Sequence, residues 1–223
     1  MCKMGLFYFP ANFVYWEKVK DHDKIKDRLL DEINKRESCD SVHKKDILLT
    51  KSSSDYHSRT NDIANCFTET DIKNIIWEPL DHVLEEMNSR KYATKIVANE
   101  SYITASWYTR YESNGSMKLH THSSGSYIRD GKIYTPTFSM IYILNNENEC
   151  NSTIFKETAS ENRISIMGPA YANNGSMEHQ FHTKDVKEIS EGTVLIFPSS
   201  LYHMVDITPI PGRITIAINI ASC

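Results

Sequence analysis

The chain has 223 residues, 40% of them hydrophobic, and its 25 Lys and Arg against 29 Asp and Glu give a formal net charge of -4. A chain of this length and hydrophobic content can bury one full core as a single domain of the larger all-β sort. The slightly acidic balance disfavours nucleic acid as a partner, because affinity for a phosphate backbone comes from clustered Lys and Arg.

The sequence carries no pattern for membrane insertion or secretion. It has no run of 18 apolar residues, and its first ten residues lack the charged-then-apolar layout of a secretory signal. Five cysteines, widely scattered and never in a CxxC pair, are typical of reduced thiols rather than of a disulfide framework. We therefore expect a soluble, cytoplasmic protein without a membrane partner.

The N-terminal part combines one strand-like run with two helix-like patterns. Gly5–Phe9 is apolar and aromatic and is stopped by a proline, which predicts an early strand. Residues 23–36 place apolar side chains at helical spacing on a charged segment, so we expect a helix lying on a surface. Residues 37–65 are polar and Ser-rich and predict a loop. A second helix is expected from about residue 70 to 90, bent at Pro79.

From about Tyr92 the sequence changes to short β-type runs. These are KIVAN, SYITASWYTRY, FSMIYIL, TVLIF and RITIAINI, separated by Asn, Gly, Ser and Pro. Such runs without a helical segment between them indicate a sandwich or barrel rather than a parallel α/β sheet. We therefore expect a mainly β protein with N-terminal helices, forming one domain over residues 1–223. In it, residues 1–91 would supply the early strand and the helices, and residues 92–223 a mostly antiparallel β core.

Three histidines in the β-rich part form a candidate metal site. His120 and His122 follow the strand of residues 106–111 and an Asn-Gly turn at residues 114–115. Residues i and i+2 of a strand project to the same face, so both imidazoles can bind one ion. His203 follows a later strand that ends in Phe-Pro. We interpret these three histidines as the ligands of one mononuclear metal site, which only the fold can assemble.

The motifs together resemble a known enzyme family. HTH, the SMIYILN strand, the EGTVLIFPSSLYH segment and GRITIAIN are similar to the iron(II)- and 2-oxoglutarate-dependent oxygenases, on their prolyl 4-hydroxylase-like side. They are most similar to a group often encoded by phages, for which the location would be the host cytoplasm. The resemblance covers roughly residues 106–220. It implies a double-stranded β-helix (jelly-roll) core with helices packed outside.

The resemblance implies iron(II) as the metal, held on one face of an octahedron by two histidines and a carboxylate. The usual motif is H-x-D with a distal His, and His122 stands where the Asp would be. Three neutral imidazoles leave the metal one more positive charge, so zinc or nickel is an alternative occupant. A further alternative is that a carboxylate, Asp130 or Glu178, is the third ligand.

The resemblance also implies 2-oxoglutarate as the cosubstrate and dioxygen as the oxidant. The far carboxylate of 2-oxoglutarate would meet Arg213, whose guanidinium offers a planar bidentate fork. Thr215 shares the face of Arg213, and Tyr111 takes the place of a tyrosine that hydrogen-bonds the same carboxylate. Ser139 lies on the pocket-facing side of its strand. Ile143 stands where many relatives have another tyrosine.

The implied reaction is hydroxylation of a C–H bond in a peptidyl or small-molecule substrate, with release of succinate and carbon dioxide. Residues 123–136 and 157–187 are long polar stretches that we expect to act as lids. His179 and His182 are interpreted as loop residues without a metal. Two other functions stay open. One is a cupin-like three-His enzyme that does not use 2-oxoglutarate, and the other is a non-catalytic metal-binding or structural module.

Overall fold

The computed structural model of the chain describes residues 5–9, 12–38, 48–55, 62–89, 100–123, 125–146, 153–157 and 179–223. Its strands form one 11-stranded sheet, ordered β1-β2-β9-β6-β11-β4-β10-β7-β8, with β3 paired to β4 and β5 to β6. All pairings between these strands are antiparallel.

The strands are β1 (Gly5–Phe9), β2 (Asn12–Lys18), β3 (Leu49–Ser54), β4 (Ser101–His120), β5 (Tyr127–Arg129), β6 (Lys132–Asn145), β7 (Thr153–Glu157), β8 (His179–His182), β9 (Thr193–Pro198), β10 (Tyr202–Thr208) and β11 (Arg213–Ser222). The helices are α1 (His22–Glu37), α2 (Glu69–Ile72) and α3 (Glu78–Ser89). The remaining elements are a π-helical segment, η2 (Lys73–Trp77), and the 3-10 turns η1 (Ile63–Cys66) and η3 (Thr183–Asp185).

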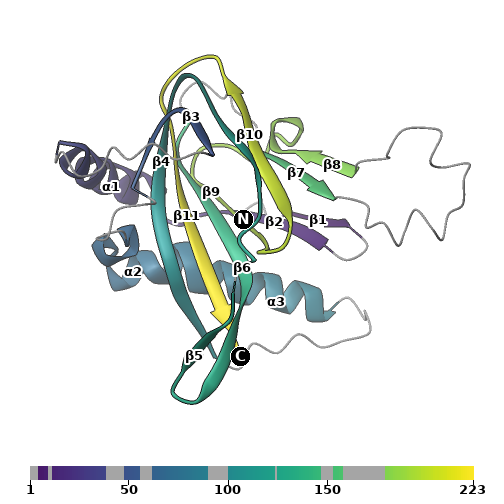
Figure 1. The fold of residues 1–223 in the computed structure, drawn as a ribbon. Coiled ribbons are helices and arrows are strands. Elements are labelled where there is room, and N and C mark those ends of the chain that lie inside the picture. Colours follow the sequence, from purple (N-terminus) through teal and green to yellow (C-terminus); the bar gives the residue numbers. More distant parts are fainter. Residues whose placement is uncertain are drawn as a thin grey trace, which may run out of the picture.

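β4 is a long strand that joins two parts of the sheet. Its first part, residues 101–111, pairs with β11, and its second part, from Gly115 to His120, pairs with β10. Because β4 changes partners along its length, the sheet curls over on itself into a half-barrel (Figure 1). The curl brings β10 in front of the sheet (Figure 1), and β7 pairs with β10 and contacts β11 through a hydrogen bond between Thr153 and Arg213.

The change of partner in β4 coincides with a local irregularity at an Asn-Gly pair. Asn114 has a φ of 61°, in the left-handed region that Asn enters more readily than most residues. A Cβ on Gly115 would lie 2.6 Å from the backbone oxygen of Lys51, so only glycine fits against β3 there. The turn predicted at residues 114–115 is therefore wrong, because the chain continues through this point as one strand.

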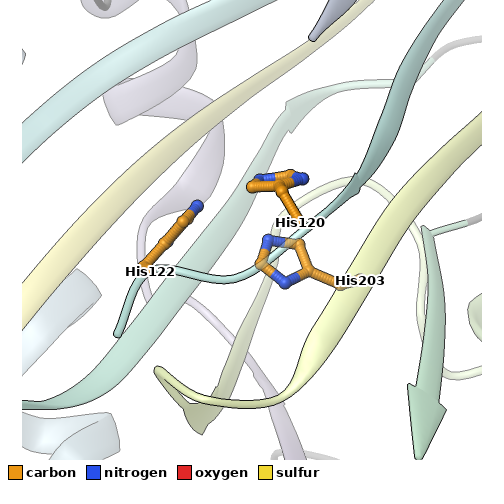
Figure 2. A group of neighbouring side chains, drawn as sticks. All are labelled: His120, His122 and His203. Carbon is orange, nitrogen blue, oxygen red and sulfur yellow. The ribbon is translucent and has the colours of Figure 1, made fainter. Parts of the chain in front are cut away.

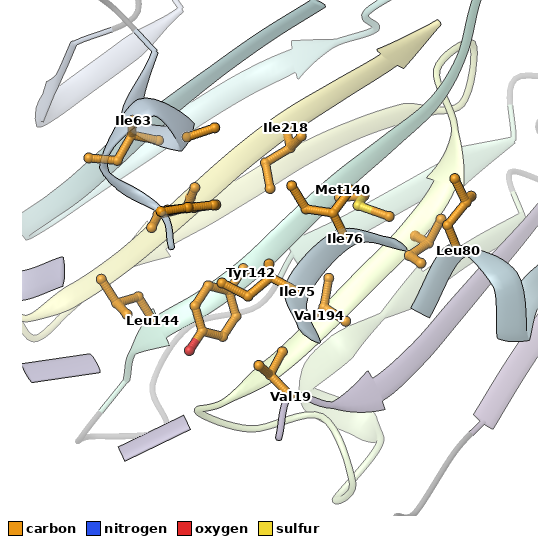
Figure 3. Packing of buried hydrophobic residues seen from close by; sticks show 14 of the residues in the cluster. Val19, Ile63, Ile75, Ile76, Leu80, Met140, Tyr142, Leu144, Val194 and Ile218 are labelled. Atoms are coloured by element: carbon orange, nitrogen blue, oxygen red, sulfur yellow. The ribbon is translucent and has the colours of Figure 1, made fainter. Parts of the chain in front are cut away.

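The helices cover the outer face of the sheet. Successive side chains of β6 and β11 point to opposite faces, and the apolar ones that face outward pack against the helices (Figure 3). This cluster includes Ile214, Ile216, Ile218 and Ile220 of β11, Met140, Tyr142 and Leu144 of β6, and Leu29, Ile33, Ile75, Ile76, Leu80 and Val83 of the helices. Full burial of each such side chain stabilises the fold by about 1.5–3 kcal/mol, which fixes the sheet on its support.

The inner face carries polar residues of the same strands. In β11 the alternate residues that begin at Arg213 and include Thr215 and Asn219 point to this face, because successive residues of a strand point to opposite faces. A second apolar cluster fills part of the interior; it consists of Val14, Trp16, Ile141, Phe155, Phe181, Leu195, Phe197 and Leu201. The polar residues of the inner face are therefore set in an apolar interior.

The predicted strand at Gly5–Phe9 and the predicted helix at residues 23–36 are confirmed as β1 and α1. The loop predicted for residues 37–65 is wrong in part, because β3 lies within it and pairs with β4. β2 was not predicted, since the proline before it was interpreted as a stop. With β1, β2 and β3, the N-terminal part supplies strands to the sheet as well as supporting helices.

The second predicted helix begins at Glu69 and ends at Ser89, through α2, η2 and α3. Thr68 caps its start in a reciprocal pair of hydrogen bonds with Asp71. The π-helical segment η2 ends at Trp77, two residues before Pro79, which has no N–H to donate to the carbonyl four residues earlier. The irregularity expected at the proline therefore takes the form of a wider helical turn.

Four of the predicted β-type runs are confirmed as parts of β4, β6, β9 and β11. The fifth run, KIVAN, lies outside the described residues, and so does the expected boundary between residues 91 and 92. Residues 123–136, expected to be a lid, form mainly a hairpin of β5 and the start of β6 where they are described. Of residues 157–187, residues 158–178 lie outside the described part. Among the described helices, none has the length and apolar character needed to cross a membrane.

Candidate metal centre

The predicted ligands His120 and His203 come together through strand pairing. They are direct partners across β4 and β10, and directly opposite residues of an antiparallel pair project to the same face. Their ring centroids lie 4.2 Å apart. His122 lies just beyond the end of β4, where its backbone N–H donates to the oxygen of Ser199 over 2.9 Å. Its ring centroid is 4.9 Å from that of His120 and 4.8 Å from that of His203.

The three rings face a common point (Figure 2), and one ligand atom from each lies within 4.8 Å of the others. His120 Nδ1 lies 2.8 Å from the backbone oxygen of Lys118, and His203 Nδ1 lies 3.0 Å from that of Leu201. A carbonyl oxygen only accepts, so both rings carry their proton on Nδ1 and their lone pair on Nε2. A metal-binding histidine usually has this arrangement, with its other nitrogen held by an acceptor.

His122 also carries its proton on Nδ1, but there the hydrogen-bond acceptor is a side chain. Its Nδ1 lies 2.8 Å from Asn219 Oδ1 and 3.2 Å from Ser139 Oγ. The Ser139 hydroxyl donates to the same Asn219 oxygen over 2.9 Å. The ring also makes an edge contact with Trp107, with centroids 5.3 Å apart. With the proton on Nδ1, His122 too presents its Nε2 lone pair as the ligand atom.

Burial keeps these imidazoles in the form that binds metals. Burial lowers the pKa of His203 well below its ordinary value, and His122 and His120 lower it further by repulsion between charges. Burial likewise lowers the pKa of His122 to about 4, with a contribution from His120, although the hydrogen bond to Asn219 opposes the shift. Metal ligation requires neutral imidazole, so His122 and His203 need lose no proton near neutral pH.

Arg213 lies on the inner face at the start of β11 and is only 2% exposed. Its Nη2 donates to Thr153 Oγ1 over 2.7 Å, but Nε and Nη1 have no hydrogen-bond partner among the described residues. Its guanidinium carbon lies 5.5 Å from the ring centroid of Tyr111. A buried cation without an acidic partner is costly, so this position suits an anionic ligand.

Tyr111 and Thr215 stand beside Arg213. Tyr111 is the cross-strand partner of Arg213, and its hydroxyl is hydrogen-bonded to the Thr215 side chain. Burial raises the pKa of Tyr111 to about 12, against the opposing influence of Arg213 and of this hydrogen bond. The tyrosine therefore stays a neutral hydroxyl. Ile143 is the partner of Thr215 on β6, which places an apolar side chain next to this group.

Strand β7 connects the arginine to the histidines. Phe155 is paired with His203, and their ring centroids lie 6.0 Å apart. Thr153, the partner of Arg213, is two residues earlier on β7 and points to the same face, about 6.6 Å along the strand. Arg213 and His203 therefore line the same inner surface, because they contact Thr153 and Phe155, which are two residues apart on β7.

Ser139 lies on the inner face of the sheet, as expected for the pocket-facing side of its strand, and its hydroxyl contacts His122 and Asn219. The register of β6 places it at the histidine end of this face: Ser139 is opposite Asn219, whereas the residue after Arg213 is opposite Asn145, six positions further along. Its role in binding the cosubstrate stays a prediction. Asn219 itself was missed. Its even spacing from Arg213 along the last strand was the signal that could have found it.

The alternative ligands are placed elsewhere or not described. Asp130 lies in the exposed turn between β5 and β6, with Oδ2 3.7 Å from Arg129 Nε, and it is not part of the three-histidine cluster. Glu178 lies outside the described residues. His182 is on β8 rather than in a loop, and its Nε2 lies 3.0 Å from Gln180 Oε1.

Neither a protein-family model nor a curated protein matches the chain, but solved structures share its fold. HygX from Streptomyces hygroscopicus, solved with nickel, 2-oxoglutarate and hygromycin B bound, is 11% identical; the match covers 94% of this chain and 82% of HygX, with a TM-score of 0.55. The non-heme α-ketoglutarate-dependent carbocyclase SnoK, from nogalamycin biosynthesis, is 9% identical over 93% of this chain and 79% of its own, with a TM-score of 0.56.

A third solved structure is a prolyl hydroxylase from Trichoplax adhaerens, in complex with a peptide fragment of hypoxia-inducible factor. It is 13% identical, and the match covers 92% of this chain and 82% of that chain, with a TM-score of 0.50. At such identities the likeness shows the fold and nothing finer. The fold class expected from the sequence, a jelly-roll core with helices outside, is thereby confirmed.

Proposed function

We propose that this chain is an iron(II)- and 2-oxoglutarate-dependent dioxygenase, which hydroxylates a C–H bond of a peptidyl or small-molecule substrate and releases succinate and carbon dioxide. One observation carries the proposal. A cluster of three histidines lies on the same inner face as a buried arginine, two of whose nitrogens have no partner among the described residues, and a cosubstrate that binds both groups requires this arrangement. Bound iron would supply the activation of dioxygen.

The histidines suit an iron site with open positions. Each presents an Nε2 lone pair, and three ligands on one side of an ion leave the other side to a chelating cosubstrate and dioxygen. Imidazole also suits zinc and nickel, so the ligand set does not by itself select iron. The redox chemistry of the proposed reaction requires iron, because zinc has no accessible redox change.

The charges of the site favour a dianionic cosubstrate. Three neutral imidazoles leave a divalent ion with its full charge of +2, and the Arg213 guanidinium adds one more positive charge. The two carboxylates of 2-oxoglutarate would reduce this total from +3 to +1, which relieves most of the unbalanced charge of a buried site. With His122 in place of a carboxylate, the site is one charge more positive than in the usual ligand pattern, so its attraction for a dianion is stronger.

Arg213 would bind the far carboxylate of 2-oxoglutarate. Thr153 holds one nitrogen of the guanidinium, so the side chain is already ordered before a ligand arrives. The two unpartnered nitrogens, Nε and Nη1, would donate to carboxylate oxygens. Tyr111 and Thr215 supply neutral hydroxyls next to the arginine, and each can add a hydrogen bond to the same carboxylate.

The structures of similar fold support the reaction class and both substrate classes. HygX was solved with 2-oxoglutarate and hygromycin B, and SnoK is described as α-ketoglutarate-dependent. The prolyl hydroxylase was solved with a peptide. We therefore keep a peptidyl or small-molecule substrate in the proposal, and residues 123–136 and 157–187 as the segments that would contact it.

The test is an anaerobic titration of the protein with iron(II) and then with 2-oxoglutarate, followed by visible absorption. The wild-type protein should develop the weak charge-transfer band of the iron chelate and, once oxygen is admitted, produce succinate. Arg213→Ala should bind iron but lose the band at low 2-oxoglutarate concentration. Arg110→Ala is the matched control, because Arg110 is on the outer side of β4 and pairs with Glu37.

Two results would contradict the proposal. If the wild-type protein binds iron but gives neither band nor succinate, the oxygenase function is refuted while the metal site stands. If Arg213→Ala leaves band and succinate unchanged, the arginine does not bind the cosubstrate, and a cupin-like enzyme that works without 2-oxoglutarate becomes the better explanation.

A further inference from the structure

Asn219 closes a chain of polar groups around the third histidine. Its Oδ1 accepts hydrogen bonds from His122 Nδ1 at 2.8 Å and from the Ser139 hydroxyl at 2.9 Å. The Ser139 hydroxyl lies 3.1 Å from the hydroxyl of Ser199, and both serines are buried. The three side chains come from β11, from β6 and from the turn after β9, so three parts of the sheet converge on one imidazole.

His122 needs this support more than the other two histidines. His120 and His203 each direct Nδ1 to a backbone oxygen two residues earlier in their own segment, so local backbone geometry sets their rings. His122 lies beyond β4, and its Nδ1 faces side chains instead. The orientation of its ring therefore depends on side chains supplied by distant parts of the chain.

The amide of Asn219 decides which nitrogen of His122 is available. With the oxygen toward the ring, the proton sits on Nδ1 and the lone pair sits on Nε2. With the amide turned, its NH₂ would require the lone pair on Nδ1, and the proton on Nε2 would then block an ion. The hydroxyl of Ser139 donates to the same oxygen and so stabilises the orientation that leaves Nε2 as a ligand atom.

We propose that Asn219 is the positioning residue of the third metal ligand: its side-chain oxygen, held by the Ser139 hydroxyl that itself contacts Ser199, orients His122 so that Nε2 is available to an ion. The inference rests on the metal site of the proposed function. It adds that an amide rather than a carboxylate behind His122 keeps this ligand a neutral donor. A carboxylate at position 219 would increase the basicity of the imidazole and reduce the positive charge of the site.

Cobalt(II), whose visible bands report its coordination, is the probe for the test. Apoprotein of the wild type, Asn219→Leu and Asn219→Asp is titrated with cobalt(II). Asn219→Leu removes the acceptor at similar volume and should weaken cobalt binding by about 10- to 100-fold. Asn219→Asp restores an acceptor and should bind cobalt at least as tightly as the wild type. Because it reduces the charge, it should also bind 2-oxoglutarate more weakly.

Two controls separate positioning from a general loss of structure. Asn74→Leu removes a buried asparagine on the helical side of the sheet, away from the histidines, and should leave cobalt affinity unchanged. The second control is a double-mutant cycle with His122→Ala. If Asn219 acts through His122, then Asn219→Leu should have no further effect on cobalt affinity in the His122→Ala protein.

The inference is overturned if Asn219→Leu binds cobalt like the wild type with unchanged bands. It is also overturned if Asn219→Leu weakens binding by the same factor with and without His122, since the effect would then be structural. A wild-type protein that binds no divalent metal refutes both the inference and the proposed function. A wild-type protein that binds metal but makes no succinate refutes only the oxygenase, and the affinities still decide the role of Asn219.

Discussion

His120 and His203 are direct cross-strand partners, with ring centroids 4.2 Å apart, although 83 residues separate them in the sequence. Backbone pairing of β4 with β10 therefore fixes two of the three candidate ligands, and their Nδ1 atoms are held by backbone oxygens. The third, His122, depends on side chains. Two of the candidate ligands are thus oriented by the backbone of their own strands, and the third is oriented by side chains from other strands.

Replacing His203 should abolish metal binding. His203→Ala removes a buried ligand and leaves two imidazoles, so we expect at least a 100-fold loss of affinity for cobalt(II) or iron(II). An ion present at 100 times its dissociation constant stabilises the native wild type by about 2.7 kcal/mol. Adding metal should therefore raise the unfolding temperature of the wild type and of the control His182→Ala, but not that of His203→Ala. A metal-dependent rise in His203→Ala would exclude the histidine as a ligand.

Arg213 should reduce the stability of the ligand-free protein, although it is needed to bind 2-oxoglutarate. Arg213→Met keeps the apolar volume and removes a buried guanidinium with two unpartnered nitrogens. We expect urea unfolding of the metal-free variant to show a gain of about 1–4 kcal/mol, since replacing buried charges by apolar residues is often stabilising. The variant should also lose the stabilisation that 2-oxoglutarate gives the metal-loaded wild type. A clear loss of stability without ligand would show that the contacts of the arginine with Thr153 and Tyr111 outweigh the cost of burying its charge.

Glu191 should make stability depend on pH. Its Oε1 accepts a hydrogen bond from Lys26 Nζ at 2.6 Å and lies 3.4 Å from His22 Nε2. Its Oε2 accepts a hydrogen bond from the backbone N–H of Asn146 at 2.7 Å. Burial raises the pKa of Glu191, but these partners together outweigh it and lower the pKa below its ordinary value. A depressed pKa in the folded state means that the stabilisation is present above the unfolded-state pKa and is lost as the pH falls through the folded-state pKa.

Glu191→Gln should therefore be less stable than the wild type at pH 7. The difference should not exceed about 1 kcal/mol, because the carboxylate is partly exposed and solvent screens its ion pairs. The difference should shrink as the pH falls below about 4.5, the ordinary pKa of a glutamate carboxyl, and vanish once the carboxyl is protonated in the folded state as well. Urea unfolding at four pH values between 3 and 7 measures it. Asp130→Asn, in the exposed turn between β5 and β6, is the control and should change stability little at any pH. A constant difference across the range would rule out ionisation as its cause.

Gly115 should tolerate no side chain. A Cβ there would lie 2.6 Å from the Lys51 oxygen and 2.9 Å from the Glu112 oxygen, and both are backbone atoms that cannot move alone. Gly115→Ala should destabilise the protein by about 1–3 kcal/mol and disturb the pairing of β3 with β4. Chemical denaturation measures the loss, with Ser116→Ala on the same strand as the control. Equal stability of the two variants would mean that β3 can separate from β4 at little cost.

The sequence by itself determined the features that depend on short-range pattern. Short runs of apolar and β-branched residues predicted β6, β9 and β11, and helical spacing predicted α1. These predictions are confirmed, because residue type and period decide within a few positions which element forms and which of its sides are buried. The H-x-H pair predicted that two imidazoles lie close together, and the ring centroids of His120 and His122 are 4.9 Å apart. β3 was missed because its sequence, LTKSSS, has no apolar alternation, and only its pairing with β4 makes it a strand.

The tertiary structure alone decided which distant residues meet. The register between β6 and β11 places Ser139 opposite Asn219, and so beside His122. A shift of one residue would turn every side chain of a strand to the other face, and the outward isoleucines of β11 prevent this by packing against the helices. The register that aligns the site is thus fixed by burial on the opposite face of the sheet. No local stretch of sequence contains that information, because it arises only when strands and helices pack together.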